Sequence, residues 1–200
     1  MKKLVRNYET FLRIANAISH SRDPSEIALM TVESITTALN VKGCTLFRIS
    51  RKKNQLKVTA SYGLSKEYIN KGPLSSLQSI AQSLREGPVA IYDVTDDPRI
   101  QYPEEARKEG IASILSVPIV VGGDVIGALR VYTSQPWEFT LDDVDFVQAL
   151  AQIVGIVIIK SRVYQGQKES IRILKSMREG RMRQSTRRTP YESVPVSVLA

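Results

Sequence analysis

The sequence predicts an α+β fold, in which antiparallel strands pair as hairpins and helices cover them. Two apolar runs, Ser113–Val121 and Asp124–Thr133, are rich in Val, Ile and Leu, as strands prefer. Gly122-Gly123 between them supplies the positive-φ residues of a tight turn. A second pair of strand-like runs, Cys44–Ser50 and Gln55–Leu64, indicates another hairpin.

The last strand of the main hairpin is apolar on both faces, which is typical of a strand covered on both sides. Alternation assigns Val125, Gly127, Leu129 and Val131 to one face and Ile126, Ala128, Arg130 and Tyr132 to the other. We expect Gly127 to mark the close approach of another backbone segment. Pro118 lacks an amide donor, which predicts a bulge or a gap in pairing there.

Two helices are expected before the first strand. Asp23, Pro24 and Glu26 are the N-cap, first-turn proline and capping-box residue of the second helix, which Asn40–Gly43 ends. The first helix is amphipathic and covers about 18 residues. Its apolar residues recur at helical spacing: Leu4, Tyr8, Phe11, Leu12, Ala15 and Ile18.

The middle third is the irregular part of the chain, and irregular segments on a rigid sheet often carry binding residues. Gly and Pro punctuate it, so its elements are expected to be short. In order, the sequence predicts a polar loop at Ser65–Ser75, a helix at Ser76–Glu86, a strand at Val89–Tyr92, a turn-rich connector at Asp93–Tyr102 and a helix at Glu104–Glu109.

A long helix is expected from Leu141, with Thr140 as its N-cap. If unbroken to about Arg178 it would span roughly 57 Å, longer than a domain of this size, which favours pairing with a second copy. Would-be core positions hold polar residues, so a coiled coil would be weak, and a single frayed helix is the alternative. The predicted homodimer interface comprises Leu4, Tyr8, Phe11, Val147, Val154, Val157, Tyr164 and Ile171.

Charge is distributed unevenly. Residues 1–159 carry 18 Lys and Arg against 17 Asp and Glu, whereas residues 160–200 carry 10 against 3. We therefore expect a domain at 1–159, a basic extension of the last helix at 160–180 and a disordered basic tail at 181–200. This basic region could bind nucleic acid or an anionic membrane, but without interleaved aromatic residues such binding would be unspecific.

Three further features concern location. No apolar run approaches the roughly 18–20 residues that cross a bilayer. The N-terminus lacks the apolar core of a secretory signal, and one cysteine cannot form an intrachain disulfide. Together they predict a cytoplasmic protein.

Three segments, taken together, resemble the GAF domain family: IYDVTDDPR at Ile91–Arg99, EGIASILSVPIVVGGDVIGALRVY at Glu109–Tyr132 and FTLDDVDFVQALAQIVGIVI at Phe139–Ile158. The resemblance extends from about Phe11 to about Ile159. It implies a central antiparallel sheet of about five or six strands. It also implies terminal helices on one face, loops and short helices over a small-molecule pocket on the other, and a sensory or signalling role.

Catalytic patterns are absent from the sequence. It has no phosphate-binding G-x-x-x-x-G-K-[ST] loop, no dinucleotide fingerprint and no metal-ligand spacing, and the lone His20 fits an exposed or capping residue. GAF-type methionine sulfoxide reductases use several cysteines, whereas Cys44 is alone and fits a small buried hydrophobe. The Asn-Lys-Phe-Asp-Glu signature of the cyclic-nucleotide branch is missing. We expect a non-catalytic module without metal, haem or covalent bilin.

Two arginines, Arg48 and Arg130, interrupt otherwise apolar strands that the family's strand order makes neighbours. If both face the pocket, its low dielectric would strengthen their attraction for a carboxylate or phosphate ligand. The alternative is that one or both pair with a nearby acid or extend to solvent. The predicted ligand-binding residues are Arg48, Tyr62, Leu77, Ile80, Tyr92, Asp93, Ile100, Ser116 and Arg130.

The sequence contains no kinase, cyclase or helix-turn-helix pattern, so we expect the signal to pass to a separate output protein. A protein-docking or dimerisation module is the alternative function.

Overall fold

The structure, a computed structural model, describes residues 2–21, 23–50, 52–75 and 87–186. The chain divides into two units after Ile159. The first unit holds one six-stranded antiparallel sheet of order β3-β2-β1-β6-β5-β4, which confirms the predicted α+β fold. The strands are β1 (Gly43–Ser50), β2 (Gln55–Tyr62), β3 (Leu74–Ser75), β4 (Val89–Ile91), β5 (Ser113–Val121) and β6 (Asp124–Thr133). The helices are α1 (Lys2–His20), α2 (Pro24–Leu39), α3 (Lys66–Ile69), α5 (Pro103–Lys108) and α6 (Leu141–Thr186).

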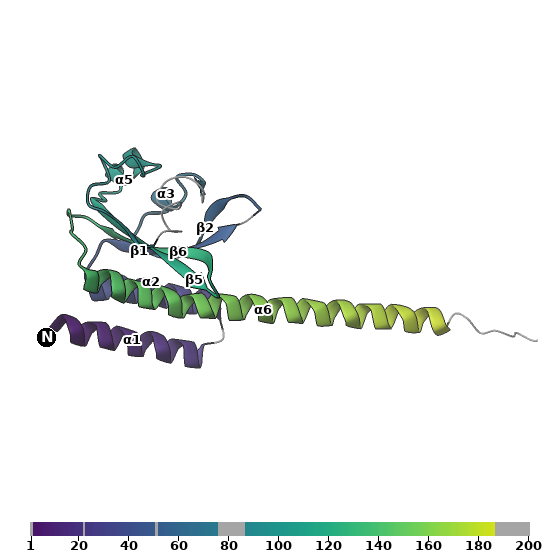
Figure 1. The fold of residues 1–200 in the computed structure, drawn as a ribbon. Coiled ribbons are helices and arrows are strands. Elements are labelled where there is room, and N and C mark those ends of the chain that lie inside the picture. The colour runs from purple at the N-terminus through teal and green to yellow at the C-terminus, as the bar shows by residue number, and fades with distance from the viewer. Residues whose placement is uncertain (1, 22, 51, 76–86, 187–200) are drawn as a thin grey trace, which may run out of the picture. The chain divides into compact units, whose positions relative to one another are not determined.

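The sheet has two differently covered faces, which we call the helix face and the loop face (Figure 1). Helix α2 and the first part of α6 cover the helix face, where Ile35, Leu129 and Leu150 belong to one buried apolar cluster, and α1 packs on the outer side of these two helices. The short helices α3 and α5 lie over the loop face, where Tyr68 of α3 and Ala106 of α5 share a second cluster. Irregular segments therefore cover the loop face alone.

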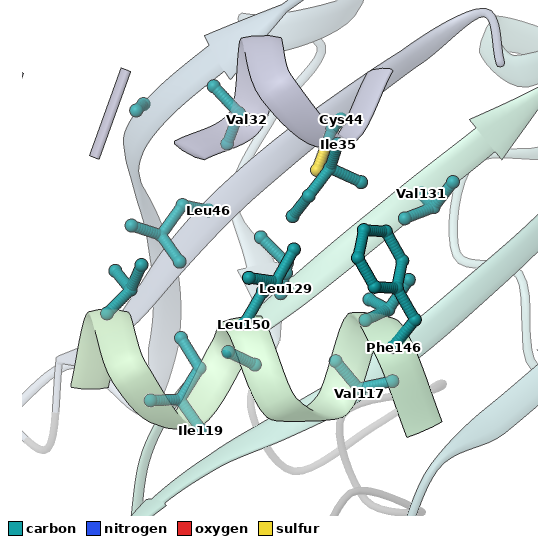
Figure 2. Close-up of a cluster of buried hydrophobic side chains, with 14 of the residues drawn as sticks. Val32, Ile35, Cys44, Leu46, Val117, Ile119, Leu129, Val131, Phe146 and Leu150 are labelled. Atoms are coloured by element: carbon teal, nitrogen blue, oxygen red, sulfur yellow. The ribbon is translucent and has the colours of Figure 1, made fainter. Parts of the chain in front are cut away.

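The helix-face core is built from alternate residues of the central strands. Leu46 of β1 and Leu129 of β6 are fully buried, and Figure 2 shows them facing Leu150 of α6. Burying one such side chain contributes roughly 1.5–3 kcal/mol, so this face supplies most of the apolar stabilisation of the domain. The broad apolar side of α6 follows from its sequence, because Val147, Leu150 and Val154 recur at helical spacing.

The main hairpin forms at the predicted residues, with one irregularity. A Cβ added at Gly127 would lie 2.2 Å from the Phe47 carbonyl oxygen, so the prediction of a close backbone approach is confirmed. The register shift falls between Ile119 and Val120, just beyond Pro118, which itself pairs with Ala128. The extra residue is Ile126, which packs in the helix-face cluster, so its predicted face was wrong.

Side-chain caps fix two helix starts as predicted. Asp23 caps α2 by accepting a hydrogen bond from the Ser25 amide (2.8 Å). The Glu26 carboxylate does not close a simple capping box, because it accepts from the Ser21 hydroxyl (2.5 Å), which in turn accepts from the Asp23 amide. At α6, the hydroxyl and amide of Thr140 both donate to Asp143, which makes a reciprocal cap.

The middle third departs from the prediction in one place. The segment predicted as a polar loop, Ser65–Ser75, contains helix α3 and strand β3. The hydroxyl of Ser65 caps α3 by accepting from the Tyr68 amide (3.1 Å). The strand at Val89–Ile91 and the helix at Pro103–Lys108 are confirmed. The predicted helix at 76–86 lies outside the described residues.

The second unit, from Lys160, is described as far as Thr186 and consists of the C-terminal part of α6. The helix ends later than the sequence predicted, so residues 181–186, which we expected to be disordered, are helical. Residues 187–200 lie outside the described part. None of the helices in the described ranges is long and apolar enough to cross a membrane.

Candidate functional site

A row of polar side chains crosses the loop face of the sheet. Ser61 of β2, Thr45 of β1, Arg130 of β6 and Ser116 of β5 lie opposite one another in register. The Thr45 and Ser61 hydroxyls are 2.9 Å apart, and Arg130 Nε donates to Ser116 Oγ at 3.3 Å. Thr45 and Ser116 are fully buried and Arg130 is 5% exposed. We call these four residues the polar row.

The polar row separates two apolar clusters of the loop face. On one side Phe47 packs with Ala128, and on the other Ile114 packs with Tyr132. The strand period of two explains this order, because Ala128, Arg130 and Tyr132 are alternate residues of β6. The charged side chain of Arg130 is therefore buried between two apolar clusters.

Arg130 has neutral neighbours. Its guanidinium lies 5.2 Å from the centre of the Phe47 ring, and its Nε donates to Ser116 Oγ. Within that part of the chain, no carboxylate lies within ion-pair distance of Arg130. Burial raises the pKa of Tyr132 to about 12, opposed by the charge of Arg130 and by hydrogen bonds from Thr45 and Arg130. A buried cation without a counter-charge costs free energy that an anion would recover.

A second cation belongs to the same site. Lys71, just after α3, donates from Nζ to the Tyr68 carbonyl oxygen (2.9 Å) and lies 3.5 Å above the centre of the Tyr68 ring. The Tyr68 ring meets the Tyr132 ring edge-on at 5.9 Å. Burial, together with the charge of Arg130, lowers the pKa of Lys71 to about 8, although Glu105 and Glu109 act in the opposite direction.

Glu109 fixes the position of α3 over the sheet. Its carboxylate accepts from the amide of Ser65 (2.9 Å) and from the Ser65 hydroxyl (2.5 Å). Lys42 lies 3.9 Å from the same carboxylate. Because Ser65 is the N-cap of α3, this contact holds Tyr68 against Tyr132, with Lys71 over the Tyr68 ring. Burial raises the pKa of the Tyr68 hydroxyl, so this side chain stays neutral.

Comparison with known families assigns this architecture. A family model described as GAF domain matches residues 21–159. The chain belongs to the GAF domain family. No curated protein matches it at the level of sequence.

Solved structures agree on the GAF fold. The GAF domain of a phosphoenolpyruvate-protein phosphotransferase from Coxiella burnetii superposes with a TM-score of 0.73 at 20% identity, covering 81% of this chain and 98% of that one. The free methionine-R-sulfoxide reductase of Neisseria meningitidis, in complex with its substrate, gives 0.67 at 17%, covering 79% and 91%. The phycoerythrobilin-bound GAF domain of a cyanobacterial phytochrome gives 0.63 at 14%, covering 80% and 97%. At these identities the likeness concerns the fold.

In this GAF domain, two of the predicted ligand-binding residues meet, namely Arg130 and Ser116. Arg48 does not join them, although β1 and β6 are neighbours as expected. It pairs with Gly127 and follows Phe47, a loop-face residue, so it lies on the helix face, and it is exposed. Tyr62 pairs with Cys44, a helix-face residue, and is 42% exposed.

The remaining predicted ligand-binding residues do not lie together. Tyr92 is 55% exposed and Asp93 is fully exposed, its carboxylate accepting from Thr95 rather than from Arg130. Ile100 packs at the edge of the loop-face cluster. Leu77 and Ile80 lie outside the described residues.

Sequence reasoning missed Lys71, Tyr68 and Thr45. Lys71 and Tyr68 belong to the segment predicted as a polar loop, where a helix of one turn leaves no periodic signal. Thr45 could have been found, because alternation places it on the face of Phe47. Tyr132 was assigned to the face of Arg130, and the structure agrees.

The two residues considered for catalysis have structural surroundings. Cys44 is fully buried, which raises the pKa of its thiol, as expected for a small buried hydrophobe. His20 is exposed at the end of α1, with Nδ1 2.8 Å from the Asn16 carbonyl oxygen. It lines an open groove of about 670 Å³ between α1 and α2, on the helical side of the domain. The described residues contain no cluster of three or more metal-ligating side chains.

The predicted dimer residues divide into core and surface. Val147 and Val154 are fully buried and Val157 is 9% exposed, so these three belong to the core of the chain itself, which corrects their assignment. Phe11 packs edge-on against Phe146 at 5.7 Å. Tyr8 and Ile171 are exposed, at 64% and 53%. The side chains of Leu4 and Tyr164 lie outside the described part.

Proposed function

We propose that this GAF domain is a non-catalytic sensor of a small anionic molecule, which binds at Arg130 on the loop face. One observation carries the proposal: Arg130 is 5% exposed, and no described residue places a carboxylate within ion-pair distance of it. A buried cation usually has a partner, because an uncompensated one costs several kcal/mol. A carboxylate or phosphate ligand would provide that partner through charge-assisted hydrogen bonds.

The surroundings of Cys44 support a non-catalytic role. A reductase of the methionine sulfoxide type needs an accessible thiolate and a resolving thiol. Cys44 is the only cysteine in the sequence and it is fully buried. Its position in the helix-face cluster also separates it from the polar row.

Strand β6 gives a physical route from ligand to output. Arg130 belongs to the polar row on the loop face. Its neighbours Leu129 and Val131 pack on the other face, in the cluster that contains Phe146 and Leu150 of α6 (Figure 2). A ligand that moves Arg130 would therefore shift the packing beneath α6. We propose that α6 carries this shift to a separate output protein.

We also propose that the chain acts as a homodimer. Exposed apolar side chains support this, because Tyr8 on α1 and Ile171 on α6 are more than half exposed. A helix rich in exposed apolar residues commonly covers them with a second copy. Dimerisation would let a binding event change the relation between two long helices.

The test is native mass spectrometry of the full chain, purified gently from its own host, before and after denaturation. We expect a small anion in the native spectrum that denaturation releases. Arg130→Ala should lose this ligand while far-UV circular dichroism remains unchanged. Arg48→Ala is the matched control, because it removes an arginine from the neighbouring strand on the opposite face, and it should retain the ligand.

Two outcomes would overturn the proposal. An Arg130→Ala variant that retains the ligand as fully as wild type would place binding elsewhere. An empty wild-type spectrum, together with no binding of added succinate or inorganic phosphate, would favour a protein-docking module.

A further inference from the structure

Arg130 and Lys71 form a pair of cations above one polar surface. Arg130 donates a hydrogen bond to Ser116, and Lys71 donates one to the Tyr68 carbonyl oxygen. A chain of contacts joins them: Lys71 lies over the Tyr68 ring, the Tyr68 ring meets the Tyr132 ring edge-on, and Tyr132 neighbours Arg130. The cations come from different elements, and the charge of Arg130 contributes to the lowered pKa of Lys71.

We infer that the site takes a small dianion, whose two negative charges are shared between Arg130 and Lys71. This inference rests on the proposed function, since it requires that Arg130 binds an anion. The ligand class is a short dicarboxylate or a phosphate monoester, which share two negative charges within a few bonds. A monoanion would satisfy Arg130 and leave Lys71 without a counter-charge.

The nearby acids do not replace the second anionic group. Glu109 is held by both Ser65 donors, and its nearest cation is Lys42 at 3.9 Å. Glu105 stabilises the charge of Lys71 from α5, but within the described residues neither acid lies within ion-pair distance of it. Tyr68 faces Lys71 and stays neutral. The charged groups around Lys71 are thus Arg130, Glu105 and Glu109, and desolvation outweighs the two acids.

Neutral donors complete the recognition surface. The hydroxyls of Thr45, Ser116 and Tyr132 lie along the floor, next to Arg130. Hydroxyl donors and a guanidinium fork suit the oxygens of a carboxylate or phosphate. Lys71 acts as a point charge, so it specifies the number of charges on the ligand more than its shape.

Matched probes that differ by one charge test this directly. Succinate and monomethyl succinate form one pair, and phenyl phosphate and methyl phenyl phosphate form the other, titrated calorimetrically into the full chain at pH 7. We expect at least one dianion to bind about ten-fold more tightly than its monoanionic partner. The pair that shows the preference identifies the dicarboxylate or the phosphate ester as the ligand chemistry.

Lys71→Met removes the second charge and keeps most of the side-chain volume. It should weaken the preferred dianion about ten-fold and its monoanionic partner less than about two-fold. Lys66→Met is the matched control, because Lys66 is an exposed lysine of α3, and it should leave both affinities unchanged. A purely structural role of Lys71 would instead weaken both members of the pair equally.

Proton uptake provides a second readout. Burial lowers the pKa of Lys71 to about 8. A dianion raises that pKa, so binding at pH 8 should take up protons, measured from titrations in buffers of different ionisation enthalpy. The Lys71→Met variant should take up none.

The failures are distinguishable. If monoanion and dianion bind equally and Arg130→Ala abolishes both, the dianion inference is wrong and the anion sensor stands. If no probe binds, the dianion inference is wrong, and the native mass spectrum decides the anion sensor. If Arg130→Ala binds as wild type does, both proposals fail.

Discussion

At the scale of single residues, two arginines on neighbouring strands differ in their exposure to solvent. Arg48 is exposed on the helix face, whereas Arg130 is buried on the loop face between Phe47 and Tyr132. Water solvates the charge of Arg48, so this charge costs little free energy. The charge of Arg130 is desolvated when no anion is bound. Under the proposed function, Arg130 lowers the stability of the ligand-free domain and provides the charge that binds the anion.

Arg130→Met should make the ligand-free domain more stable. The substitution removes an uncompensated buried charge and keeps an unbranched side chain, so we expect the free energy of unfolding to rise by about 1–3 kcal/mol. Urea unfolding of protein refolded without ligand measures this. Arg48→Met should change stability by less than about 0.5 kcal/mol. A less stable Arg130→Met would show that Phe47 and Ser116 compensate the charge fully.

Alternation along the strands predicted part of the site and misplaced the rest. It put Arg130 and Tyr132 on one face, as found, because β6 is regular between Ala128 and Tyr132. It could not give the offset between β1 and β6, which pairs Arg130 with Thr45 and leaves Arg48 on the opposite face. A strand register depends on the turns and bulges, and an offset of one residue exchanges the faces.

At the scale of elements, two glycines of α6 have opposite surroundings. A Cβ at Gly155 would lie 2.6 Å from Ile119 Cγ2 and 3.0 Å from Val121 Cγ2, so the missing side chain lets α6 approach β5 closely. At Gly166, no described atom lies within 4 Å of such a Cβ. Alanine substitutions at these two glycines therefore distinguish the effect of helix propensity from the effect of packing.

We expect Gly155→Ala to lower the free energy of unfolding by about 1–3 kcal/mol, because crowding of Ile119 outweighs the gain in helix propensity. Gly166→Ala has only the gain, about 1 kcal/mol for the helix, and should raise helicity without lowering the melting temperature. Far-UV circular dichroism with thermal unfolding measures both. Equal effects of the two variants would mean that the β5–α6 contact adapts without cost.

The long elements could be predicted from sequence and the short ones could not. The main hairpin, α2 and the start of α6 have periodic apolar residues and recognisable caps, and their bounds agree with the structure. Helix α3 has one turn, and its residue Tyr68 is buried by contacts with distant residues such as Tyr132, while Glu109, far along the chain, holds its N-cap. Long-range contacts of this kind leave no local pattern, which is why Lys71 was missed.

At the scale of the whole molecule, the proposed homodimer can cover either of two stripes of α6. The register predicted from sequence places Ile171 in the seam with the charged Lys168 and Lys175. Between residues 163 and 177, a second register contains only apolar or small residues: Val163, Gly166, Ser170, Ile173 and Met177. Coiled-coil seams exclude charge, so the second register is favoured.

Ile173→Glu should therefore raise the dimer dissociation constant at least about ten-fold, whereas Ile171→Glu should change it less than about three-fold. Sedimentation equilibrium of the full chain measures both values. A larger effect of Ile171→Glu would return the seam to the register predicted from sequence. A wild-type monomer at micromolar concentration would refute the homodimer itself.

The division of β6 between two faces has an evolutionary consequence. Residues 128, 130 and 132 lie on the loop face, and Leu129 and Val131 contact the core beneath α6. Under the proposed function, substitutions at the first set would change which molecule is recognised without disturbing the packing beneath α6. The solved structures compared above keep this fold at 20% identity to this chain or less, and such a strand would let the proposed ligand side change while the core is kept.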